Sequence, residues 1–187
     1  LKPKRILEVG CTIGQSTIGW KEAFPDAEVY GVDVAATSLR YGHARAEALG
    51  CAIAFSQQDA EHTNFPDGFF DIVASHAMIH ETSRKALRGI FAESHRILKP
   101  GGLMLHNDGT PFRDMKHPID RLIPDWDTHY NAEPFITQMR SMDLAEFAVE
   151  AGWPKGSTSN TYADEVVGAD AARTVSGGAC YMVVGRR

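Results

Sequence analysis

The fold of this chain is decided near its start by the stretch Arg5-Ile6-Leu7-Glu8-Val9-Gly10-Cys11-Thr12-Ile13-Gly14. Its first five residues form an apolar run of strand length, Gly10 ends the run, and a helical pattern begins at Gly14. Because glycine has no Cβ atom, such a turn lets backbone N–H groups come close to a ligand at the start of a helix. A turn of this kind can also merely join a strand to a helix, so by itself it indicates an α/β unit and not yet a binding site.

The alternation of strand and helix continues along the chain. Further strands are expected at residues 28–33, 52–55, 69–74, 103–106, 157–162 and 179–184, and helices at 14–24, 87–98 and 139–151 with another ending at residue 49. Strands that alternate with helices through short glycine and proline turns indicate βαβ units and a mostly parallel sheet. Right-handed crossovers then predict a doubly wound, seven-stranded α/β sheet with helices on both faces.

The composition is typical of one globular domain. Of 187 residues, 43% are hydrophobic and 23% charged, and the apolar stretches stay below the ~18–20 residues of a membrane span. We expect a single domain over residues 1–187, preceded natively by a further segment because the chain opens at Leu1, just before a core strand. A net charge of −5 without a basic stripe argues against a nucleic-acid partner. Three widely spaced cysteines imply no disulfide framework, which favours a reduced, cytoplasmic compartment.

Asp33 strengthens the ligand-binding interpretation of the glycine turn. It closes the second expected strand, about 20 residues after Gly10, the spacing at which doubly wound folds place an acidic residue that binds ribose hydroxyls. The alternative is a solvated aspartate that ends a strand or caps a helix.

Four motifs in order then give the chain a resemblance to a known family. They are residues 8–14, 32–34, 58–73 and 93–102, of which 58–73 is the most specific match. From Arg5 to about Asn107 the chain resembles class I S-adenosylmethionine-dependent methyltransferases, close to the type of ubiquinone and menaquinone biosynthesis. The resemblance implies a Rossmann-like methyltransferase fold, the cofactor S-adenosylmethionine and the product S-adenosylhomocysteine.

The resemblance also implies which residues hold the methionine end of the cofactor. Gly10 and Gly14 would lie against the methionyl part, Glu8 would orient it, and His76, just past the fourth strand, would sit beside it. Thr12 departs from the family pattern, because most members have a glycine at its position, and this puts the shape of the turn in doubt.

The adenosine end is assigned in the same way. Asp33 would accept hydrogen bonds from the ribose hydroxyls, and Val34 would flank the adenine. Asp59 would receive the adenine amino group, and the backbone N–H of Ala60 would face a ring nitrogen.

Methyl transfer from a sulfonium is an in-line displacement that depends mainly on alignment, so few catalytic side chains are required. Histidine can accept the proton of a hydroxyl, phenol or amine near neutral pH. His80 follows the fourth strand, with Glu81 beside it to orient its ring, and His106 ends the fifth, with Asp108 on the same side. We expect His80, then His106, as the general base. The alternative is that both are structural histidines and that positioning alone suffices.

Residues 109–138 contain four prolines and several aromatic residues without a sustained period. A long stretch of this kind is often functional, so we expect a mobile cap over the acceptor pocket, lined by Trp126, Tyr130 and Phe135. Ordinary surface packing is the alternative. The cap and the acidic charge balance favour a small-molecule acceptor.

Other functions fit less well. His76 and His80 lack the glutamate of a zinc-protease helix and there is no Cys-x-x-Cys, so no metal site is expected. An NAD-dependent oxidoreductase would need Gly-x-Gly-x-x-Gly, which the turn at residues 10–14 does not provide. We therefore predict methyl transfer to an O, N or C atom of a small molecule. A non-catalytic cofactor-binding module of a larger protein, or a methyltransferase that acts on a macromolecule, stays open, and so does the oligomeric state.

Overall fold

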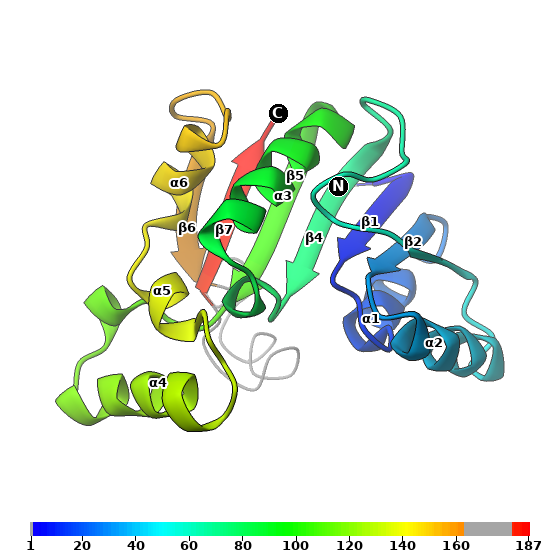
Figure 1. Cartoon of the computed structure of the whole chain (residues 1–187). Helices are drawn as coiled ribbons and strands as arrows, with labels where there is room; N and C mark the ends of the chain where they lie inside the picture. The colour runs from blue at the N-terminus through cyan, green and yellow to red at the C-terminus, as the bar shows by residue number, and fades with distance from the viewer. Residues whose placement is uncertain (1, 163–180) are drawn as a thin grey trace.

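Seven strands form a single sheet in the order β3-β2-β1-β4-β5-β7-β6 in the computed structural model, which describes residues 2–162 and 181–187 (Figure 1). The first five strands are parallel, and β7 runs antiparallel to both of its neighbours. This confirms the expected doubly wound, mostly parallel sheet. The strands are β1 (Arg5–Val9), β2 (Glu28–Asp33), β3 (Ile53–Gln57), β4 (Phe70–His76), β5 (Leu98–Asp108), β6 (Thr158–Tyr162) and β7 (Tyr181–Arg186). Residues 179 and 180, the start of the last expected strand, lie outside the described residues.

Helices cover both faces of the sheet because the strands are apolar on both. On one face Leu7 and Val73 belong to a core that includes Leu87 and Phe147, and on the other Ile6 and Ile72 form a second core. The helices are α1 (Gln15–Ala23), α2 (Ala36–Ala48), α3 (Arg84–Ile97), α4 (Pro118–Tyr130), α5 (Ile136–Arg140) and α6 (Leu144–Glu150), with the 3-10 turns η1 (Ile79–Glu81) and η2 (Phe112–Asp114).

Helix α3 shows how local sequence sets an element. Ser83 caps its start, since the Ser83 hydroxyl oxygen accepts a hydrogen bond from the backbone N–H of Ala86 at 3.2 Å. From there Leu87, Ile90 and Phe91 recur on one face and are buried against the sheet. The helix therefore begins a few residues before the apolar stripe that predicts it.

The segment 109–138 departs from the expectation that it lacks regular structure. It contains α4, which starts at Pro118, and the beginning of α5. Proline is tolerated in the first turn of a helix, where its missing N–H would have no partner, and the N–H of His117 donates to the Asp120 carboxylate at 3.2 Å. Even Pro124 lies inside the helix. The segment therefore contains helices although its sequence shows no sustained period.

The helix expected over residues 139–151 is two helices in the structure. Helix α5 ends at Arg140, and the Asp143 carboxylate then accepts a hydrogen bond from the backbone N–H of Glu146 at 3.0 Å, which starts α6. An aspartate that caps a new helix interrupts an apolar pattern that is otherwise continuous. Among the described residues, no helix has the length and apolar character that crossing a bilayer requires.

Candidate active site

The candidate site lies at the edge of the sheet where the parallel strands end. The carboxyl ends of β1, β2 and β4 carry Val9, Asp33 and His76, and β5 ends at Asp108. In open α/β sheets, ligands bind outside this edge. Figure 1 shows α4 and α5 beyond one side of this edge and α1 and α2 at the other.

Two positions in the turn after β1 require glycine, because neighbouring side chains leave no room for a Cβ atom. Gly10 and Gly14 have φ angles of 66° and 72°, in the left-handed region that side chains disfavour. A Cβ atom on Gly10 would lie 2.4 Å from Cγ of Met78, and one on Gly14 would lie 2.6 Å from Cζ of Phe55. Thr12, at φ 46°, adopts the left-handed conformation despite its side chain. Thr12 therefore takes a backbone conformation that glycine adopts more readily.

Asp33 fixes this turn from the neighbouring strand. One of its carboxylate oxygens accepts a hydrogen bond from the backbone N–H of Thr12 and the other from that of Ala35, each at 2.8 Å. A carboxylate has about four lone-pair sites, so capacity remains for further donors. Asp33 is nearly buried, whereas Val34 beside it is 67% exposed. The pair thus offers a fixed acceptor next to an uncovered apolar side chain.

Glu8 is a buried carboxylate below the glycine turn. It accepts hydrogen bonds from the hydroxyls of Ser16 and Thr17 in the first turn of α1. Burial raises the pKa of Glu8, while these hydrogen bonds and the charge of His76 act in the opposite direction. Glu8 therefore ties β1 to α1 directly under the expected methionine end of the site.

Asp59 and Ala60 follow β3 at the same edge. The Asp59 carboxylate accepts a hydrogen bond from the backbone N–H of Glu61 at 2.8 Å, and Asp59 is exposed while Ala60 is half-buried. His76 is also exposed, and its Nδ1 lies 2.7 Å from Oδ1 of Asn107 on β5. The structure thus gathers all eight expected cofactor residues along the ends of β1 to β4.

His80 lies in η1, just after β4. Its Nδ1 is 2.8 Å from Oδ1 of Asp108, and this hydrogen bond, together with the charges of Asp108, Glu133 and Glu81, raises the pKa of His80 despite its partial burial. The side chain of Asp108 is only 3% exposed and that of His80 is 18% exposed. With Nδ1 engaged, Nε2 is the nitrogen that can exchange a proton with a ligand.

The sequence analysis assigned other partners to His80 and Asp108. Glu81, the expected partner that orients the His80 ring, lies 3.9 Å from Nε2, and Asp108 holds the ring instead. Asp108 was expected beside His106. Because β4 and β5 end at the same edge, the sequence could have indicated that His80 lies near Asp108. This prediction would have required the length of the turn between His76 and His80.

His106 does not fit the expected role of a general base. It is fully buried, its ring stacks on Phe91 with ring centroids 5.5 Å apart, and its Nδ1 lies 2.8 Å from the hydroxyl of Ser75. Burial lowers the pKa of His106 to about 3. The side chain faces the sheet surface that α3 covers and not the site, which strand alternation alone could not decide.

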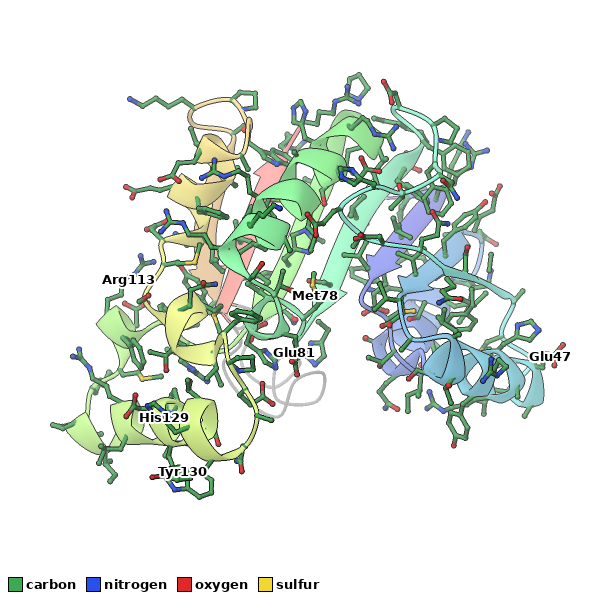
Figure 2. All side chains as sticks on the ribbon, viewed as in Figure 1. Glu47, Met78, Glu81, Arg113, His129 and Tyr130 are labelled. Carbon is green, nitrogen blue, oxygen red and sulfur yellow. The ribbon has the colours of Figure 1, made fainter. Side chains whose placement is uncertain are left out.

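The segment 109–138, the expected cap, approaches the site at Glu133, which lies between α4 and α5 and which the sequence did not single out. Oε2 of Glu133 lies 3.8 Å from Nε2 of His80. The expected lining residues Trp126 and Tyr130 are exposed and Phe135 is half-buried. Figure 2 shows Tyr130 on the side of α4 that faces away from the strand ends, whereas Met78 lies at the tip of β4 and Glu81 below it.

Comparisons with known proteins agree with this architecture. The family model described as a methyltransferase domain matches residues 6–102, from β1 into β5. The chain is 37% identical over 105 residues to the demethylmenaquinone methyltransferase of Thermus thermophilus, covering 55% of this chain and 46% of that protein. It is 31% identical over 152 residues to the fatty-acid O-methyltransferase of Mycolicibacterium smegmatis, covering 81% and 50%. The chain thus spans half or less of these relatives.

Solved structures show the same fold. A SAM-dependent methyltransferase from Methanosarcina mazei superposes with a TM-score of 0.69 at 16% identity, covering 100% of this chain and 93% of that one. A SAM-dependent methyltransferase from Aquifex aeolicus gives a TM-score of 0.64 at 17% identity, covering 98% and 81%.

Proposed function

The chain belongs to the class I S-adenosylmethionine-dependent methyltransferase family, and on that premise we propose that it transfers a methyl group to a small-molecule acceptor by in-line displacement. The observation that carries the proposal is the position of the His80–Asp108 pair beside the glycine turn. Met78, two residues before His80, packs directly on Gly10. A proton acceptor and a cofactor cradle therefore occupy one edge of the sheet.

The residues at this edge fit the cofactor. Asp33 presents a fixed carboxylate with capacity for further donors beside the exposed Val34. We assign Glu8, Gly10, Gly14 and His76 to its methionine end and the remaining four to its adenosine end: Asp33, Val34, Asp59 and Ala60. S-adenosylmethionine supplies an electrophilic methyl group on a sulfonium, so the chain itself needs to position the acceptor, exclude water and manage one proton.

His80 is the residue that we propose for the proton. Its Nδ1–H donates to Asp108, which fixes the tautomer and leaves the lone pair on Nε2. A neutral Nε2 can then accept the proton of the acceptor as the methyl group is transferred. His106 is not proposed, because it is buried away from this edge.

A small acceptor is supported by charge and by the cap. The net charge of −5 does not suit a polyanion, and residues 109–138 lie beside the strand ends within the proposed single domain 1–187. The names of the two relatives above indicate a quinone precursor and a fatty acid as their acceptors.

Cys11 and Cys51 are free thiols, which supports the proposed cytoplasmic location. A non-catalytic binding module or a macromolecular acceptor is the alternative.

The experiment is calorimetric titration with S-adenosylhomocysteine and with NADH. We expect S-adenosylhomocysteine to bind with micromolar affinity and NADH not to bind. Binding of NADH without S-adenosylhomocysteine would overturn the proposal.

A further inference from the structure

Three potential hydrogen-bond acceptor atoms lie close together, namely Nε2 of the proposed base His80 and one carboxylate oxygen each of Glu81 and Glu133. Oε1 of Glu81 lies 3.9 Å and Oε2 of Glu133 lies 3.8 Å from Nε2 of His80. One ligand atom from each of the three residues lies within 4.8 Å of the other two. They come from η1 and from the connection between α4 and α5, so the core and the cap both contribute.

One of these atoms, Oε2 of Glu133, lacks a hydrogen-bond donor within the described part of the chain. Oε2 of Glu133 is shielded from solvent and accepts no hydrogen bond from the residues that the structure describes, although the whole side chain is 28% exposed. A buried carboxylate oxygen without a donor is unfavourable and is relieved by a hydrogen-bond donor or a cation. Its position next to Nε2 of His80 means that such a donor would lie beside the base.

The charge around these three atoms is negative. Asp108, Glu81 and Glu133 all act on His80 and favour its cationic form. Among the described residues, Arg140 is a cation near them; its charge acts on Asp108, and its guanidinium donates a hydrogen bond to the carbonyl oxygen of Thr110 at 2.6 Å. Three carboxylates with one arginine attract a positively charged ligand.

The spacing of these atoms lies between that expected for a coordinated metal and that expected for a hydrogen-bonded cation. A tetrahedral zinc ion with bonds of about 2.1 Å needs ligand atoms roughly 3.4 Å apart. An ammonium group with hydrogen bonds of about 2.8 Å needs acceptors roughly 4.6 Å apart. The observed separations of 3.8 and 3.9 Å lie between the two values, and Glu81, with 57% of its side chain exposed, is free to adjust in either direction. A metal ion has no nucleophilic lone pair, so of the two cations only an ammonium ion can become a methyl acceptor, by losing a proton.

We propose that the methyl acceptor is a primary amine, which enters as an ammonium ion bound by Glu81 and Glu133 and gives one proton to Nε2 of His80. This inference rests on the proposed function and names its acceptor class. Loss of the proton leaves a lone pair on the amine nitrogen, which forms the bond to the methyl carbon. The carbon–sulfur bond breaks with its electron pair remaining on sulfur, and the product is a methylated ammonium ion. His80 returns its proton to solvent.

The test compares matched amines and alcohols. The protein is saturated with S-adenosylhomocysteine, and the affinities of ethylamine, butylamine and phenethylamine are compared with those of ethanol, butanol and 2-phenylethanol. We expect each amine that binds to bind at least tenfold more tightly than its alcohol. Glu133→Gln should weaken amine binding at least tenfold while S-adenosylhomocysteine affinity stays within twofold.

The matched control is Asp125→Asn, which removes an exposed carboxylate from α4 and should leave amine affinity unchanged. Equal affinities for amines and alcohols, no amine binding, or an unchanged amine affinity in Glu133→Gln would overturn the inference while S-adenosylhomocysteine still binds. Tighter binding of Mn²⁺ than of any amine, lost in Glu133→Gln, would also overturn it in favour of a metal site. Failure of S-adenosylhomocysteine to bind would instead overturn the proposed function itself, and this inference with it.

Discussion

The His80–Asp108 pair sets the pH range in which the proposed proton transfer can occur. His80 must be neutral to accept a proton, and Asp108 first, then Glu133 and Glu81, hold the pKa of His80 above 6.5. We predict that kcat rises with pH through a midpoint above 6.5. Asp108→Asn removes a negative charge, so it should move the midpoint to lower pH and reduce kcat. The pH profile of kcat for the two proteins measures both effects.

His106→Ala is the control for this profile. It removes a fully buried ring that packs on Phe91, so it should lower the free energy of unfolding and leave the midpoint in place. A midpoint that is the same with and without the Asp108 carboxylate would show that His80 is not the base.

Gly10 provides a second prediction, with a matched control elsewhere in the chain. Gly10→Ala introduces both a left-handed alanine and a contact with Met78, whereas Gly50→Ala, at φ 68°, meets no atom within 4 Å. We expect Gly50→Ala to lower the free energy of unfolding by about 1–2 kcal/mol, the cost of a left-handed residue. Gly10→Ala should cost more and should also weaken S-adenosylhomocysteine binding. Denaturant unfolding and calorimetry measure the two effects, and equal unfolding costs would contradict the packing of Met78 on the turn.

Asp33 provides the third prediction at this scale. Asp33→Ala should weaken S-adenosylhomocysteine binding by about 1.5–3 kcal/mol, because hydrogen bonds to a charged group are lost. Asp59→Ala should weaken it less, since Asp59 is exposed. Calorimetry gives both values. The assignment of Asp33 to the ribose would be wrong if the Asp59 variant lost more affinity than the Asp33 variant.

At the scale of elements, the proposed cap lies in the part of the chain that the family model does not match. Helix α4 buries only Pro124, and its apolar residues Leu122, Ile123 and Trp126 are exposed. An element with few buried contacts opens at low free energy cost. We therefore predict fast amide hydrogen exchange in α4 that slows when cofactor and acceptor are both bound. Slow exchange that ligands leave unchanged would contradict a mobile cap.

The parallel core could be predicted from sequence because its strands are apolar runs that end at glycine or at a charged residue. Arg5–Val9 and Glu28–Asp33 have the predicted limits for this reason. Helix α4 could not be predicted in this way, since it lacks a clear apolar stripe of buried residues and contains Pro124 in its interior, where proline is normally unfavourable. The proposed cofactor residues could be placed along the sheet edge from the spacing of the motifs. Glu133 did not, because its approach to His80 depends on how the cap folds back.

At the scale of the whole molecule, the proposed cofactor residues, the proposed base and the proposed cap lie at one edge of one sheet. The central claim is that this arrangement transfers a methyl group to a small molecule. It is tested most directly with S-adenosylmethionine labelled in its methyl group, incubated with the protein and separate pools of small metabolites, proteins and nucleic acids. We predict that label enters the small-molecule pool and that this transfer is lost in His80→Ala and kept in Asp125→Asn. Label in protein or nucleic acid alone, or bound cofactor with no transfer to any pool, would contradict the account.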